Sequence, residues 1–303
     1  MKRFLSRILP LLLSFGLILN CTGCSTVLVL AGKARENSEV SSSVISESSA
    51  SSGVISTPVP TEDGDLRAFY TDVANAESVT VMVYMIGSDL ESEDGSATDD
   101  LLEMADAALS ENIHLVLQTG GTETWWNDVC TDDESERFVI ENGDMTLLQN
   151  LGSVNMTDAD TLSDFIRFSA ESYPADRYEL ILWDHGGGTM TGFGYDELYE
   201  DTSLTLSSLS TALYNGGVQF DFIGFDACLM ATAEVAYALD PYADYLIASE
   251  ESEPGEGWAY KNWLTMLAED PAVPTAELGK KLADDFLEAY IFADMPTLSV
   301  LDL

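Results

Sequence analysis

The chain has 303 residues, of which 46% are apolar, so it is long enough for one large or two modest domains with a hydrophobic core. Its 53 acidic residues against 12 basic ones give a formal net charge of −41, which repels phosphates and argues against nucleic-acid binding. Such a surface would instead attract cationic peptides or divalent cations, although an acidic, highly soluble secreted protein would show the same charge.

The first 23 residues are predicted to be a secretory signal of the lipoprotein type. Three basic residues lie within the first seven, and the apolar run over 8–19 is too short for a comfortable membrane span. Cys24 follows small residues just after this run, as in the lipobox of bacterial lipoproteins. Lipidation of Cys24 would tether the protein to a membrane surface, whereas an ordinary secretory signal would release it.

Residues 24–65 are predicted to be a flexible linker. The stretch over 41–56 is mostly serine, and the prolines Pro58 and Pro60 follow it. Such a composition cannot bury enough apolar surface to fold. A globular domain is therefore expected over residues 66–303.

Buried strands and helical segments alternate along this domain. Strands are predicted over 79–86, 113–118, 138–141, 145–148, 178–183, 220–225, 245–248 and 298–301. Helices are predicted over 101–109, 162–173, 206–215, 227–239 and 278–291, and an acidic loop over 87–100. The alternation favours an α/β fold with a mostly parallel sheet and helices on both faces. Catalytic groups in such folds gather beyond the carboxyl ends of the strands.

His185 closes one of the predicted strands. It stands in the run Trp183-Asp184-His185-Gly186-Gly187-Gly188 and is one of two histidines in the chain. The glycines allow a close approach of backbone and substrate, and their N–H groups could hold an oxyanion. Taken alone, His185 could equally be a hydrogen-bonded histidine in a turn.

Cys228 follows the next predicted strand, at its expected junction with a helix over 227–239. A helix dipole would stabilise a thiolate there, and a nearby histidine could protonate a leaving amine. A lone cysteine is more often a buried structural thiol. Because only one helix separates His185 from Cys228, however, a right-handed crossover would bring both strand ends to the same edge of the sheet.

Four motifs resemble those of the clostripain-related cysteine peptidases, which are relatives of the gingipains, caspases and legumain. They are VYMIGSDLE (83–91), WDHGGG (183–188), FDACLM (225–230) and SEESEPGEGWAY (249–260). The resemblance implies a caspase-like three-layer sandwich, a dyad of His185 and Cys228, and an oxyanion hole formed by the backbone N–H groups of Gly186 and Cys228. Members of this family usually continue well past the point where this chain stops.

Family members often cut after Arg or Lys, and the resemblance places the acidic substrate pocket at Asp226 and Glu256. Asp226 could alternatively cap the following helix, and Glu256 could be a solvated turn residue. Some members respond to calcium, so calcium is a possible cofactor, and the acidic loop is a candidate site. A solvated acidic loop is the simpler interpretation, because its spacing does not match an EF-hand.

Two hypotheses follow for the function. The first is an extracytoplasmic cysteine endopeptidase, expected to be monomeric, that acts on protein or peptide substrates. The second is a non-catalytic acidic lipoprotein that binds cationic peptides or surface polymers and needs neither His185 nor Cys228. Transpeptidation by the same dyad cannot be separated from hydrolysis at this level.

Overall fold

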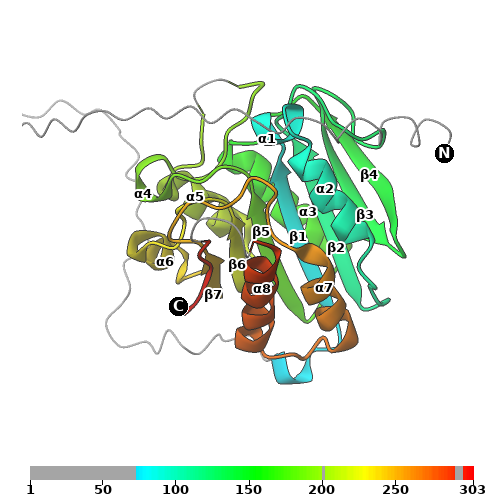
Figure 1. The fold of residues 1–303 in the computed structure, drawn as a ribbon, viewed down its shortest axis with the longest axis vertical. Helices are drawn as coiled ribbons and strands as arrows, with labels where there is room; N and C mark the ends of the chain where they lie inside the picture. Colours follow the sequence, from blue (N-terminus) through cyan, green and yellow to red (C-terminus); the bar gives the residue numbers. More distant parts are fainter. Residues whose placement is uncertain (1–72, 200–201, 291–295) are drawn as a thin grey trace, which may run out of the picture. The chain divides into compact units, whose positions relative to one another are not determined.

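The computed structural model describes residues 73–199, 202–290 and 296–303. The predicted signal, the linker and Cys24 lie outside these residues. The described chain contains one eight-stranded sheet in the order β4-β3-β2-β1-β5-β6-β7-β8 (Figure 1). The strands are β1 (Val79–Ile86), β2 (Ile113–Gly120), β3 (Ser135–Glu141), β4 (Asp144–Gly152), β5 (Arg177–Trp183), β6 (Phe220–Asp226), β7 (Ala243–Ala248) and β8 (Ser299–Asp302).

The centre of the sheet is parallel and its two edges are antiparallel. Strands β2, β1, β5, β6 and β7 pair in parallel, whereas β3, β4 and β8 pair antiparallel to their neighbours. Strands β1 and β5 are buried almost throughout, as expected for strands covered on both faces. The hairpin predicted at Asn142-Gly143 joins β3 to β4, and both residues have positive φ.

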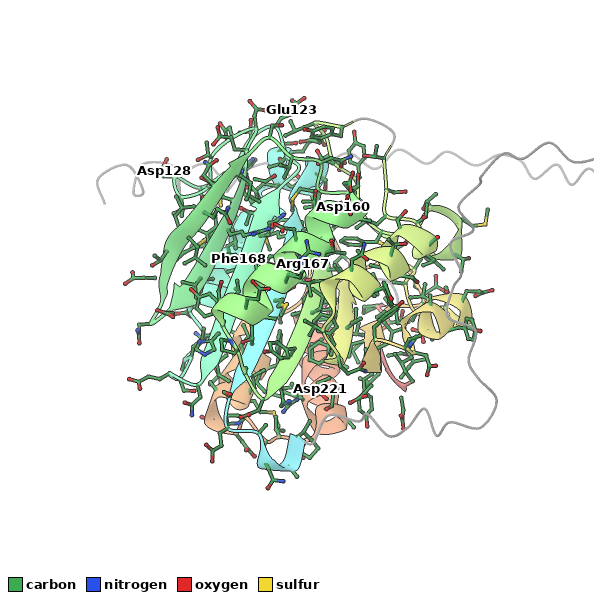
Figure 2. All side chains as sticks on the ribbon, turned by 180° about the vertical axis from the view of Figure 1, so that it is seen from behind. Glu123, Asp128, Asp160, Arg167, Phe168 and Asp221 are labelled. Carbon is green, nitrogen blue, oxygen red and sulfur yellow. The ribbon has the colours of Figure 1, made fainter. Side chains whose placement is uncertain are left out.

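Helices cover both faces of the sheet. They are α1 (Ser88–Ser92), α2 (Ser96–Ala105), α3 (Ala159–Ser172), α4 (Gly188–Thr191), α5 (Leu206–Gly216), α6 (Ala233–Leu239), α7 (Tyr260–Glu269) and α8 (Thr275–Ala289). In Figure 1, α2, α7 and α8 lie in front of the sheet, and in Figure 2, which shows the opposite face, α3 and α5 lie in front. Two separate apolar clusters fill the spaces between the layers, so the predicted three-layer α/β architecture is confirmed.

Two predicted helix boundaries are wrong. The loop expected over 87–100 contains α1 and the start of α2, which Gly95 separates with a φ of 75°. The helix expected from Ala227 begins only at Ala233, where the side chain of Thr232 caps it. Between these points the N–H groups of Leu229 and Ala231 donate to the carbonyls of Glu251 and Ser249. These bonds to a distant loop replace the bonds that a helix would have made.

Sequence analysis missed helix α7. Its buried residues are Tyr260, Trp263, Leu264 and Leu267, which follow the i, i+3, i+4, i+7 spacing of an amphipathic helix. Within the described ranges no helix is both long enough and apolar enough to span a bilayer.

Candidate active site

Three neighbouring strands end at one edge of the sheet, and a polar residue follows each of them. Asp89 follows β1, His185 follows β5 and Cys228 follows β6. In the sheet, β5 lies between β1 and β6, and Trp183 at the end of β5 is in register with Asp226 at the end of β6. The parallel pairing therefore brings the segments that carry the predicted dyad side by side.

Asp89 is hydrogen-bonded to His185. The distance between Asp89 Oδ1 and His185 Nε2 is 2.7 Å, and about two fifths of each side chain remains exposed. Sequence analysis placed Asp89 in an acidic loop and found no third member for the dyad. The pairing of β1 with β5 is the signal that could have found it, since parallel neighbours end at the same edge.

The segments after β5 and β6 touch at Gly186. A Cβ atom placed on Gly186 would lie 2.0 Å from the carbonyl oxygen of Cys228, far inside any normal contact. Gly188, with a φ of +57°, is similarly close to Leu229, whose carbonyl oxygen would lie 2.9 Å from an added Cβ. These two positions of the glycine run therefore need glycine, because the segment carrying Cys228 packs directly on their backbone.

Cys228 lies in a turn rather than at a helix N-terminus. Leu229 has a φ of 64° and is partly exposed, and α6 starts five residues beyond Cys228. The expected stabilisation of a thiolate by the helix dipole is therefore wrong. Instead the backbone N–H of Glu253 faces the sulfur at 3.3 Å, and such a donor stabilises negative charge on it. The thiol is partly exposed.

Both N–H groups of the predicted oxyanion hole are available. Within the described part of the chain, neither Gly186 nor Cys228 donates its backbone N–H to another residue. A hollow of about 460 Å³ opens beside Gly186, and its lining includes Asp89, His185 and Tyr195 but not Cys228. The hollow gives a peptide room to reach the His185 side of the two segments.

Asp184 anchors the loop that carries His185. Its carboxylate accepts hydrogen bonds from the Ser88 hydroxyl, at 2.7 Å, and from the backbone N–H of Tyr195. Asp184 is buried, and this burial raises its pKa to about 7. The anchor joins the segment after β1 to the segment after His185.

Asp226 is buried at the end of β6. Its Oδ2 accepts hydrogen bonds from the Trp258 backbone N–H at 2.9 Å and from the Tyr260 hydroxyl at 2.7 Å. Asp100 lies in the same interior and accepts the indole N–H of Trp183 at 2.6 Å. Burial is the main cause that raises the pKa of both carboxyls above the ordinary value, and their mutual repulsion adds to it for Asp100.

Two glutamates lie on the segment that approaches Asp226. Glu256 is exposed, and its charge acts with those of Asp100 and Asp226 to raise the pKa of Tyr290, for which burial is the main cause. Glu253 has both carboxylate oxygens buried, and burial, followed by repulsion from Asp226, raises its pKa. Sequence analysis named Glu256 and missed Glu253.

The acidic residues of the candidate calcium loop have separate partners. Asp89 binds His185, whereas buried Glu91 accepts the N–H and hydroxyl of Thr98 and the N–H of Trp126. Among the described residues, no group of three or more His, Cys, Asp or Glu side chains is arranged to hold a metal ion. Cys130 is a free, buried thiol whose pKa burial raises to about 12.

The chain is similar to known cysteine proteases. The model of the clostripain family matches residues 83–303. Clostripain of Hathewaya histolytica is 29% identical over 217 residues, which cover 61% of this chain and 41% of that protein. The chain thus spans less than half the length of this curated relative.

Solved structures show the same fold. A secreted C11 cysteine protease of Bacteroides thetaiotaomicron, in complex with an irreversible peptide inhibitor, matches with a TM-score of 0.59 and 24% identity over 71% of this chain and 59% of that one. An inactive zymogen of a C11 protease from Parabacteroides distasonis matches with a TM-score of 0.57 and 26% identity, covering 74% of this chain and 61% of that one.

Proposed function

The chain belongs to the clostripain family, and from this membership and the geometry of the site we propose that it is a cysteine endopeptidase that cuts after Arg or Lys. The contact between Gly186 and the carbonyl oxygen of Cys228 carries the proposal, because it joins the two segments of the dyad at one edge of the sheet. A protein that only binds cationic partners through its acidic surface needs neither this contact nor the hydrogen bond between Asp89 and His185. Catalysis is therefore favoured over the binding hypothesis.

In the proposed reaction, the thiol of Cys228 gives its proton to His185, and its sulfur attacks the carbonyl carbon of the scissile bond. The free N–H groups of Gly186 and Cys228 would hold the oxyanion that forms. His185 gives a proton to the leaving amine as the C–N bond breaks, and water then hydrolyses the thioester. Because Asp89 occupies Nε2 of His185, Nδ1 is the ring nitrogen left for this proton transfer.

The preference for Arg or Lys would come from the carboxyls near Cys228. Asp226 lies two residues before the nucleophile, and Glu256 lies on the neighbouring turn. A guanidinium or ammonium group can offset the desolvation of a buried carboxylate, whereas an apolar side chain cannot.

Protein or peptide substrates reach such an enzyme outside the cytoplasm. The proposed location is the outer face of the cell membrane, with Cys24 lipidated and 24–65 as a linker to a monomeric catalytic domain. Calcium is a possible ligand of the acidic surface, and no catalytic step is assigned to it.

Active-site labelling tests the proposed function. An acyloxymethyl ketone with Arg at its reactive end should label the wild-type protein at Cys228, and Cys228→Ala should not be labelled. A matched probe with Asp in place of Arg should label far more slowly. Equal labelling of Cys228→Ala, or a preference for Asp, would contradict the proposal.

A further inference from the structure

Three carboxyls are buried near one another without a cation. They belong to Asp100, Asp226 and Glu253, and a Cβ atom on Gly257 would lie within 3.0 Å of both Asp100 Oδ2 and Asp226 Oδ2. The described chain has six Lys and Arg residues, and each forms an ion pair elsewhere. These pairs are Arg137–Asp164, Arg167–Asp164, Arg177–Glu179 and Arg177–Asp221, Lys261–Asp106, Lys280–Asp284, and Lys281–Asp285. Burying several carboxyls without a positive partner is costly, so such a cluster needs protons or an external cation.

Glu253 is the member of the cluster whose hydrogen bonds are missing. Among the described residues, no group donates a hydrogen bond of normal geometry to either of its buried carboxylate oxygens. The indole N–H of Trp258, a residue only 1% exposed, lies nearby and is also without a partner of normal geometry. The Trp258 indole N–H and the Ala227 backbone N–H lie close enough to Glu253 to oppose the rise of its pKa, but neither makes a hydrogen bond of normal geometry. Buried polar groups that are this incompletely paired mark a site that another molecule can complete.

Glu253 also contacts the nucleophile directly. Its backbone N–H faces Cys228 Sγ at 3.3 Å, and its carboxyl lies against that of Asp226. Two ionised carboxylates repel each other, so the neighbouring carboxyls of Glu253 and Asp226 favour a state in which one of them holds a proton or a cation lies beside them. The pair is thus in a position to bind either a proton or a cationic side chain.

We propose that Glu253 receives the cationic side chain of the substrate and releases to solvent the proton that it shares with Asp226 while the pocket is empty. This inference rests on the proposed function and names the residue that determines its specificity. The release keeps the charge balanced, because one proton leaves as one guanidinium or ammonium group enters. Exposed Glu256 stays in water and has less to gain from a cation, since solvent already screens its charge.

The groups that face Glu253 make this exchange favourable. Asp226 at the end of β6, Cys228 in the following turn and Tyr260 on α7 interact with Glu253 electrostatically. Around these lie Asp100 and Glu103 on α2, Tyr290 after α8, and Glu256, which interact with Asp226 or with one another. All of them are neutral or negative, so none competes with the substrate as a cation. Burial, followed by repulsion from Asp226 and Cys228, raises the pKa of Glu253 and so favours a proton on it until a positive charge arrives.

Paired peptide substrates test the inference. They differ only in Arg or neutral citrulline before the scissile bond, and the ratio of their kcat/KM values is measured for wild type, Glu253→Gln and Glu256→Gln. Glu253→Gln should lower the ratio by about tenfold or more, as expected for a lost charged hydrogen bond, and should lower it further than Glu256→Gln does. The kcat/KM for the citrulline substrate should change little in Glu253→Gln. A purely structural defect would instead lower kcat/KM for both the Arg and the citrulline substrate.

Glu250→Gln is the matched control. This exposed glutamate lies on the same loop and accepts the Ser299 hydroxyl, which an amide oxygen can also accept, so the ratio should equal that of wild type. A wild-type ratio near one would overturn the Arg preference and this inference together. A high wild-type ratio that survives Glu253→Gln would overturn this inference alone.

Proton release provides a second measurement, in which Glu253 is not substituted. Binding of agmatine to Cys228→Ala is followed by calorimetry in two buffers that differ in ionisation enthalpy. Release of about one proton per bound cation near neutral pH is expected, because burial raises the pKa values of these carboxyls. Binding with no proton release would overturn the exchange.

Discussion

Asp89 Oδ1 lies 2.7 Å from His185 Nε2, although 96 residues separate them in the sequence. The two side chains meet because β1 and β5 are parallel neighbours that end at the same edge of the sheet. The bond fixes which ring nitrogen of His185 faces the substrate, so Asp89 is a positioning residue in the proposed mechanism.

Asp89→Ala should lower kcat by about 100-fold with little change in KM, since general acid–base catalysis depends on the orientation of the imidazole. The pH–rate profile should also change shape, which a merely structural defect would not cause. Asp94→Asn, an exposed position in the same acidic segment, is the control and should match wild type. Unchanged kcat in Asp89→Ala would remove Asp89 from the mechanism.

Cys228→Ala should abolish peptidase activity, and His185→Ala should cost several orders of magnitude, because members of a catalytic unit fail together. Cys130→Ser should retain nearly full activity, since this thiol is buried in the core and lies outside the site. Initial rates on a fluorogenic Arg substrate compare the three variants. More than a few per cent of wild-type turnover in Cys228→Ala would show that another nucleophile acts.

Gly186→Ala should inactivate the protein, because the new Cβ would lie 2.0 Å from the carbonyl oxygen of Cys228 and must push the two segments apart. Gly217→Ala is an informative comparison. Gly217 has a φ of +71° but nothing within 4 Å of an added Cβ, so it should lose about 1 kcal/mol of stability and keep its activity. Thermal unfolding and kcat/KM, measured on both variants, separate strain from loss of the site.

The free energy of unfolding should fall as the pH rises from about 5 to about 8.5. Burial raises the pKa of Asp184 to about 7 and that of Glu179 to about 8, and it also raises the pKa of Asp226. The unfolded chain has carboxyl pKa values near the ordinary value of about 4, so the native state holds extra protons between about pH 4 and pH 8. The stability that these extra protons contribute is fully present below this pH window and is lost as the pH rises through it. The Tm should therefore be about 5 °C or more higher at pH 5.5 than at pH 8.5.

Asp226→Asn is the matched variant for this pH dependence. An amide oxygen can still accept from the Trp258 N–H and the Tyr260 hydroxyl, and it removes one buried charge. The variant should flatten the pH dependence and raise the Tm at pH 8.5 while losing the preference for Arg. A Tm at pH 8.5 below that of wild type would show that the ionised carboxylate stabilises the fold.

The active enzyme should be a single chain. Between residues 178 and 260 the sequence has no Lys or Arg, so an enzyme specific for basic residues has no site to cut between His185 and Cys228. Arg177 is fully buried, where it binds Asp221, Glu179 and the carbonyl oxygens of Pro271 and Val273. Figure 2 shows Asp221, the ion-pair partner of Arg177, at one end of the sheet and Glu123, which follows β2, at the opposite end.

Sequencing the N-termini of the purified active protein checks this prediction. Cleavage at Lys33, Arg35 or Arg67, which lie outside the described residues, would agree with it. A stable form cut between His185 and Cys228 would contradict either the single-chain model or the basic specificity. Cys228→Ala serves as the control that separates self-cleavage from cleavage by other proteases.

Local patterns were sufficient to predict most of the sheet. The apolar runs of β1 and β5 and the turn at Asn142-Gly143 depend on neighbouring residues, and each lies where the sequence predicts. The turn at Cys228 could not be predicted in this way, because its backbone donates to residues 18 and 22 positions away. The roles of Asp89 and Glu253 likewise arise only when distant segments meet.

The order in which the strands bring their residues to the site also constrains folding. Asp89 follows β1 and His185 follows β5, and between them in sequence lie α2, β2, β3, β4, α3 and β5. Contacts of such long sequence separation form slowly, because the intervening chain must first be ordered. During refolding, activity should therefore appear together with the completed central sheet rather than with any single helix or hairpin. A chain that emerges residue by residue would stay inert until β1, β5 and β6 have met.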